Sequence, residues 1–166
     1  MSHINTLEAL AAECKRRGLH VAIDTCGYVP QDSFERILPY TDLFLYDLKL
    51  MDPTRHQQHT GQNNALILKN LQYLSGSGAK INLRIPLIEG INSAPEDINA
   101  ILRFIKPLRI VQVNLLPYHN TGSSKYAKLG NPPPPPSSLL CAPSPARLEA
   151  IQHQFTDAGL ETCIGG

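Results

Sequence analysis

The sequence lacks several features that would place a chain in a class at once. It carries no excess of charge: the formal net charge is +1 and charged residues make up 17% of 166 residues, which gives no electrostatic footprint for nucleic acid. No apolar stretch approaches the roughly 20 residues that a membrane span needs. The N-terminal segment is amphipathic, without the unbroken apolar region of a signal peptide. These absences favour a soluble, cytoplasmic protein with no nucleic-acid or membrane partner.

Closely spaced cysteines are also missing. Cys14, Cys26, Cys141 and Cys163 form no C-x-x-C pair, whereas structural zinc and iron–sulfur sites usually draw on closely spaced pairs. The pattern favours reduced, partly buried thiols, with a reactive thiol at Cys26 as the alternative.

Segments of strand and helix character alternate along the chain. A helix whose predicted cap is Asn5, with Glu8 as its reciprocal partner, precedes four strand–helix units. The strands are expected in HVAID, LYDLK, INLRIP and IVQVNLLPYH, and the tail LETCIGG is suited to one more short strand. This order predicts an α/β fold with a parallel sheet and helices outside it, either an open doubly wound sheet or part of a (β/α) barrel. Residues 1–166 are of a length that suits one domain.

Five consecutive prolines interrupt this order within residues 131–145. Such a run cannot enter a helix or a central strand, so it is predicted to be an extended loop. It is either a stiff surface loop or a ligand for a proline-recognition domain. Beyond it, Ser144 is the expected cap of the last helix and Pro145 its first residue.

Each predicted strand has one aliphatic face and one polar face, because side chains two apart point the same way. In INLRIP, Asn82 and Arg84 share one face, while Ile81, Leu83 and Ile85 share the other. Parallel strands covered on both faces usually read as near-continuous aliphatic runs. We therefore expect helices to bury the aliphatic faces and the polar faces to line a barrel interior.

Charged side chains gather toward the carboxyl ends of these strands, where α/β proteins place their sites. They are Asp24, Asp47, Lys49, Arg84 and, just beyond the fourth strand, His119. Burying an aspartate or lysine is costly unless it is paired or bonded to a ligand. This set suits a zwitterionic or anionic ligand; a self-satisfied ion-pair network is the competing interpretation.

Seven motifs occur in a particular order: AIDTCGY, LYDLKLMD, H-x-x-H-T-G, I-L-x-N-L, R-I-P-L-I-x-G-x-N, L-L-P-Y-H-x-x-G-x-x-K-Y-x-x-L-G and a closing GG. In order and spacing, from about His20 to Leu129 and again in the last helix, they resemble the radical S-adenosylmethionine activating enzymes of glycyl radical enzymes. Pyruvate formate-lyase activating enzyme is the best-known member. The resemblance implies a TIM-barrel-like partial (β/α) barrel, with about four parallel βα units here of the family's six.

The resemblance also implies a function. Family members are oxidoreductases of the [formate-C-acetyltransferase]-activating type. They hold a [4Fe–4S] cluster on a C-x3-C-x2-C motif, take electrons from flavodoxin or ferredoxin, and cleave S-adenosylmethionine to make a glycyl radical on a partner enzyme in anaerobic metabolism. This sequence contains neither C-x3-C-x2-C nor the family's GGE motif. It is therefore expected to be a C-terminal portion, inactive alone and without iron–sulfur ligands of its own.

Individual roles carry over where residues match the family's motifs. The implied cofactor-binding residues are Asp24, Thr25, Leu45, Asp47, Lys49, Arg84 and His119. Asp24, Thr25, Asp47 and the Leu45 carbonyl resemble the ligands of a monovalent cation beside the cofactor's methionyl part. Lys49 and Asp47 are the catalytic candidates, with Lys49 acting near the substrate glycine or the cofactor carboxylate. Arg84 and His119 resemble contacts to the methionyl part and to the ribose or adenine.

Other functions stay open beside the activase. One is a non-catalytic docking module for the glycyl radical enzyme. Another is an aldolase-like barrel with Lys49 as a Schiff-base nucleophile, although Asp47 would keep that lysine charged. His56 and His59, in a predicted loop at i, i+3 spacing, are a weak metal-binding candidate. A first strand at Val21–Asp24 with an unpaired edge would favour a dimer through that edge.

Overall fold

Five parallel strands form one sheet in the computed structural model, which describes residues 3–119 and 140–165. They are paired in sequence order and comprise β1 (Ala22–Thr25), β2 (Leu43–Asp47), β3 (Ile81–Leu87), β4 (Gln112–Pro117) and β5 (Thr162–Ile164). The four predicted strands and the short fifth one are confirmed. The sheet is not closed into a ring, and β1 pairs only with β2 among the described strands. The dimer expected through this edge stays a prediction.

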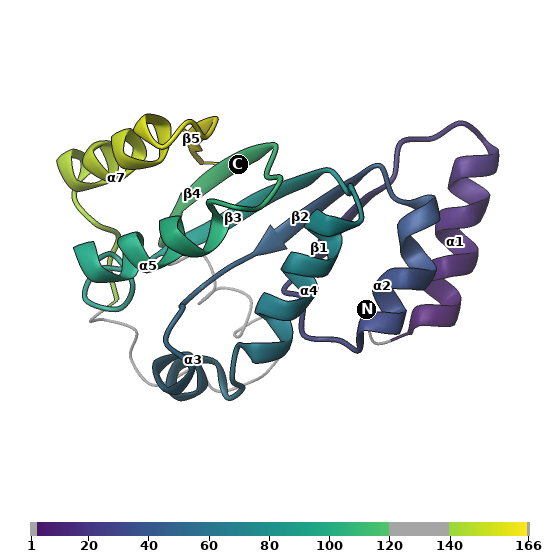
Figure 1. Cartoon of the computed structure of the whole chain (residues 1–166), viewed down its shortest axis with the longest axis horizontal. Coiled ribbons are helices and arrows are strands. Elements are labelled where there is room, and N and C mark those ends of the chain that lie inside the picture. Colours follow the sequence, from purple (N-terminus) through teal and green to yellow (C-terminus); the bar gives the residue numbers. More distant parts are fainter. Residues whose placement is uncertain (1–2, 120–139, 166) are drawn as a thin grey trace.

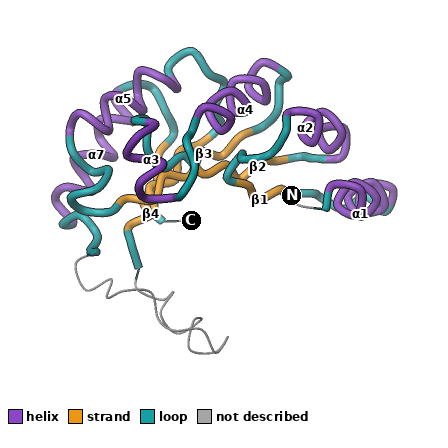
Figure 2. Tube along the Cα trace, turned by 90° about the horizontal axis from the view of Figure 1, so that it is seen from below, coloured by secondary structure: helices purple, strands orange, loops and turns teal. Residues whose placement is uncertain are grey.

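Helices cover one side of the sheet. They are α1 (Ile4–Arg16), α2 (Gln31–Ile37), α3 (Pro53–Thr60), α4 (Ala65–Gly76), α5 (Pro95–Ile105) and α7 (Pro145–Asp157), with a short 3₁₀ turn at Leu38–Tyr40. Figure 1 shows β2 running toward α3, and Figure 2 shows the other helices following one another in an arc along one face of the strands. This arrangement confirms the predicted α/β partial barrel. None of the described helices combines the length and the apolar character needed to cross a membrane.

The hydrophobic core lies between the sheet and this arc of helices. On β3, Ile81, Leu83, Ile85 and Leu87 are fully buried, whereas Asn82, Arg84 and Pro86 between them are partly exposed. Strand β2 alternates in the same way, with Phe44 and Tyr46 buried. Full burial of such side chains contributes about 1.5–3 kcal/mol each. The predicted division into an aliphatic helix-facing side and a polar inner side is confirmed.

The two predicted helix caps have different outcomes. Ser144 accepts a hydrogen bond from the Arg147 backbone N–H, with Pro145 as the first residue of α7, as expected. The Asn5 cap is wrong, because α1 begins at Ile4 and His3 holds the cap position without a side-chain bond. Asn5 and Glu8 instead accept hydrogen bonds from the Arg36 guanidinium of α2. Their side chains therefore join two helices rather than start one.

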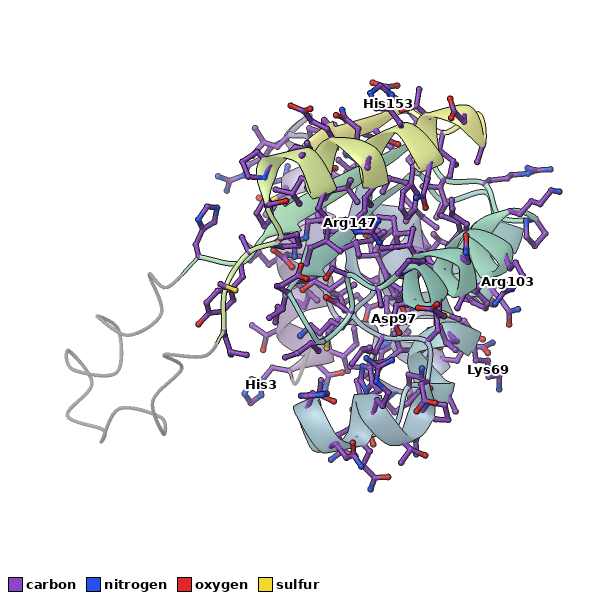
Figure 3. The ribbon with its side chains drawn as sticks, turned by 90° about the vertical axis from the view of Figure 1, so that its left-hand side faces the viewer. His3, Lys69, Asp97, Arg103, Arg147 and His153 are labelled. Atoms are coloured by element: carbon purple, nitrogen blue, oxygen red, sulfur yellow. The ribbon has the colours of Figure 1, made fainter. Side chains whose placement is uncertain are left out.

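The proline-rich loop predicted for 131–145 lies mostly outside the described residues. At its C-terminal end the chain enters α7, whose Arg147 donates two hydrogen bonds to the Ser93 carbonyl, 3.3 Å and 2.7 Å long. Figure 3 shows this side of the molecule, with Arg147 and Asp97 labelled. On the same side, Asp97 accepts a 2.6 Å hydrogen bond from Arg55 of α3. These contacts fix the helices that stand around the carboxyl ends of the strands.

Candidate functional site

The register of the sheet places four of the predicted site residues, Asp24, Leu45, Asp47 and Arg84, on two adjacent rows of the inner face. Asp24 lies opposite Leu45 on the neighbouring strand, and Asp47 lies opposite Arg84. Arg84 is in turn opposite Asn114 on β4. Because neighbouring strands are roughly 4.8 Å apart, these side chains fall within reach of one another.

Arg84 joins the two carboxylates. Its Nη1 donates to Asp24 Oδ2 at 2.8 Å, and its Nε donates to Asp47 Oδ1 at 2.8 Å. The side chain of Asp24 is 64% exposed, whereas those of Asp47 and Arg84 are 21% and 20% exposed. Burial by itself would lower the pKa of Arg84, but the hydrogen bonds and charges of Asp24 and Asp47 outweigh it and raise the pKa. Two acids therefore share one permanent cation, leaving this triad with a net negative charge.

Lys49 follows β2 and lies beside Asp47. The two residues together line a cavity of about 190 Å³ with Cys26, Tyr28 and His56. They also line a second one of about 380 Å³, with Pro86 and Asn92 among its other walls. An acid and a base on one face thus open onto shared space at the carboxyl ends of the strands. This is the placement that the alternation in LYDLK predicts.

Thr25 and His119 form no hydrogen bond or ion pair with Asp24, Asp47 or Arg84. The Thr25 side chain is on the helix-facing side of β1, 8% exposed, and its Oγ1 accepts a 3.0 Å hydrogen bond from the Gly27 N–H. His119 comes two residues after β4 and is exposed. Three of the five charged side chains are therefore in direct contact, and Lys49 shares cavities with Asp47. The ligand roles of all seven residues, Asp24, Thr25, Leu45, Asp47, Lys49, Arg84 and His119, stay predictions.

His56 and His59 lie on a helix, which corrects the predicted loop. Asp52 caps α3 by accepting from the Arg55 N–H, and Pro53 occupies its first turn, a combination typical of helix starts. His56 is 3% exposed, and its Nδ1 lies 2.6 Å from the Gln62 carbonyl oxygen. Because a carbonyl only accepts, Nδ1 carries the proton there. His56 is thus held by the loop that follows α3, while His59 lines the larger cavity.

Three buried asparagines form a part of the site that sequence reasoning missed. Asn64, Asn70 and Asn92 are at most 3% exposed, and each donates to two backbone carbonyls of the segments around the site. Asn70 and Asn92 are the asparagines of the motifs I-L-x-N-L and R-I-P-L-I-x-G-x-N, and these motifs were the sequence signal that could have indicated their importance. Composition and periodicity gave no other.

The described residues do not fit an iron–sulfur cluster. No three histidine, cysteine or acidic side chains among them are grouped closely enough to hold a metal ion. The four cysteines are free thiols on separate segments. S-adenosylmethionine fits better, because its ammonium and sulfonium groups suit Asp24 and Asp47, and its carboxylate suits Lys49 and Arg84.

Comparison with known proteins gives the family. The structure superposes on a domain of pyruvate-formate lyase-activating enzyme from Bacteroides vulgatus with a TM-score of 0.84 and 30% identity, covering 99% of this chain and 92% of that one. The chain belongs to the radical S-adenosylmethionine activating enzymes of glycyl radical enzymes. The resemblance carried by the sequence motifs is thereby confirmed.

Curated relatives of this activating-enzyme chain agree. It is 47% identical over 155 residues to the trans-4-hydroxy-L-proline dehydratase activating enzyme of Clostridioides difficile, covering 92% of this chain and 51% of the relative. It is 39% identical to the choline trimethylamine-lyase activating enzyme of Oleidesulfovibrio alaskensis, covering 73% of this chain and 40% of the relative. The chain thus spans about half the length of the curated relatives it matches. No family model matches.

A more distant structure shares the fold alone. Streptococcus suis SuiB is 16% identical, with a TM-score of 0.72 over 96% of this chain and 36% of SuiB. The fold that carries the site therefore also occurs in a protein of quite different sequence.

Proposed function

We propose that this chain is the part of a glycyl-radical-enzyme activase that binds S-adenosylmethionine through Asp24, Asp47, Lys49 and Arg84. The observation that carries the proposal is the contact of Arg84 with both carboxylates on the open inner face, beside cavities that Lys49 lines. Both curated relatives named above are activating enzymes, which favours this function over an aldolase-like barrel.

Each side chain has a distinct task in the proposed site. Asp24 and Asp47 supply negative charge for the cofactor's ammonium and sulfonium groups, and they would hold a monovalent cation together with the Leu45 carbonyl. Thr25 is not included, because its hydroxyl accepts from the Gly27 N–H on the helix-facing side of β1. Lys49 and Arg84 neutralise the cofactor's carboxylate. When bound, the cofactor supplies the source of the radical that is passed to the partner's glycine. His119, exposed after β4, is proposed to contact the ribose or adenine.

Arg84 must divide its bonds when the cofactor is present. Asp24 Oδ1 and Oδ2 both accept from the guanidinium, so a cation at Asp24 would compete for the same oxygens. We propose that Arg84 releases Asp24, the more exposed of the two acids, and keeps Asp47. The freed N–H groups then face the cofactor carboxylate, to which a guanidinium can bind through two hydrogen bonds.

The isolated chain is expected to bind S-adenosylmethionine through Lys49, and Lys49→Met should weaken binding at least about tenfold, because a charge-assisted hydrogen bond is worth roughly 1.5–3 kcal/mol. Lys69→Met is the matched control, since it removes the same charge from an exposed position on α4. Isothermal titration calorimetry measures both. Equal affinities of the two variants, or no binding by the unaltered chain, would contradict the proposal.

The partner is proposed to be a glycyl radical enzyme, and a trans-4-hydroxy-L-proline dehydratase is the first to test because that relative's activating enzyme is 47% identical. Immobilised chain should retain the purified dehydratase, and retain it more strongly with S-adenosylmethionine present. Retention that is independent of the cofactor would favour the docking-module function instead. The [4Fe–4S] cluster and the reductant, flavodoxin or ferredoxin, belong to the activity of the whole enzyme, which we propose to be cytoplasmic.

A further inference from the structure

The segment Lys49–Met51 leaves the sheet directly after β2 and is held by side chains rather than by a strand. The last backbone hydrogen bond to β3 here is donated by the Leu48 N–H to the Arg84 carbonyl and is 2.9 Å long. The carbonyls of Lys49, Leu50 and Met51 each accept a hydrogen bond from an asparagine amide. Asn92 Nδ2 donates to Lys49 O at 2.8 Å, and Asn64 Nδ2 donates to Leu50 O at 2.9 Å and Met51 O at 2.7 Å.

The Asn92 side chain makes three hydrogen bonds to backbone groups. Besides Lys49 O, its Nδ2 donates to the Pro86 carbonyl at 2.6 Å, and its Oδ1 accepts from the Ile88 N–H at 2.8 Å. The side chain is 3% exposed. Asn92 thus joins the loop after β3 to the backbone of Lys49, and its removal would leave buried polar groups without partners.

Asn64 holds the same segment from another direction. It sits at the cap position of α4 but makes no capping bond there; both of its amide N–H groups go to the β2 loop. Leu48 and Leu50, on either side of Lys49, are at most 2% exposed. With its neighbours anchored in the core and its carbonyl bonded, the Lys49 backbone has little freedom.

We propose that Asn92 and Asn64 are positioning residues that fix the Lys49 side chain in the cavities it shares with Asp47. The consequence for cofactor affinity rests on the proposed function, but the effect on Lys49 itself does not. The asparagines touch the Lys49–Met51 backbone, and Asn92 also lines the larger cavity. They therefore act through Lys49 rather than on the reacting atoms.

A spectroscopic test needs no ligand. The chain is labelled with ¹³C at lysine Cε, and the Lys49 resonance is assigned by its absence in Lys49→Arg. Asn92→Ala is expected to move this resonance toward those of exposed lysines such as Lys69. If Asn92→Ala folds poorly, Asn92→Asp takes its place. This variant keeps the acceptor for the Ile88 N–H and is expected to move the Lys49 resonance in the same direction. Ile151→Ala is the control, because it opens a cavity around a buried residue of α7. It should lower stability but leave the Lys49 resonance in place.

A double-mutant cycle tests the link to function. Asn92→Ala should weaken S-adenosylmethionine binding about tenfold in the unaltered chain and less than about twofold in a Lys49→Met background, because residues acting as a unit are not additive. Equal losses in both backgrounds, or an unmoved Lys49 resonance in both Asn92→Ala and Asn64→Ala, would overturn the positioning role. Absence of cofactor binding by the unaltered chain would overturn the proposed function alone, since the resonance still decides this inference.

Discussion

Gly27→Ala is expected to destabilise the chain by at least about 3 kcal/mol, because it combines backbone strain with overpacking. Gly27 has φ +77°, and an added Cβ would overlap the hydroxyl and Cζ of Tyr46. Tyr46 cannot move aside, since it is fully buried and its hydroxyl donates a 2.6 Å hydrogen bond to the Ile67 carbonyl. Its burial also raises the pKa of the phenol, so it stays neutral. Urea unfolding measures the loss.

Gly61→Ala provides the matched control. Gly61 has φ +81°, but nothing lies within 4 Å of the position of an added Cβ. The cost there is backbone strain alone, about 1 kcal/mol. The difference between the two variants isolates the contact between the Gly27 loop and Tyr46. Similar losses for both would show that this loop is not packed as described.

Leu83→Ala is expected to cost about 2–5 kcal/mol, because it opens a cavity in a close-packed core. Leu83 is fully buried on the helix-facing side of β3. Its neighbour Asn82 lies on the inner face, where its amide donates a 3.2 Å hydrogen bond to Gln112. Asn82→Ala loses one partly exposed hydrogen bond and should cost no more than about 1.5 kcal/mol. Thermal and urea unfolding compare the pair.

Adjacent positions on one strand thus report on the two faces separately. A second helical layer against the inner face would bury Asn82 and make both substitutions costly. Equal destabilisation by Leu83→Ala and Asn82→Ala would therefore contradict the open inner face on which the site depends.

The faces of the strands were predictable from sequence because alternation in a strand is a local property. Ile81, Leu83 and Ile85 could be assigned to one side and Asn82 and Arg84 to the other without knowing the neighbours. The gathering of acids and bases at one end followed from the parallel order of the strands.

The partners of these residues were not predictable in the same way. That Arg84 reaches across β2 to Asp24 depends on the register of three strands, which the sequence pattern does not determine. The resemblance assigns Thr25 to the cation site, yet its hydroxyl accepts a hydrogen bond from the Gly27 N–H on the helix-facing side. Asn64, Asn70 and Asn92 follow neither the strand nor the helix periodicity, and their hydrogen bonds join segments that are distant in sequence. A loop is the sequence-based expectation where helix α3 lies, although Asp52 and Pro53 are typical of a helix start.

The most direct test of the account is a crystal structure of the chain with S-adenosylmethionine and a potassium or sodium salt. We expect the methionyl part on the inner face between Asp24, Asp47 and Lys49, with Arg84 turned from Asp24 toward the cofactor carboxylate. A cofactor bound elsewhere, with Arg84 still bonded to both acids, would contradict it.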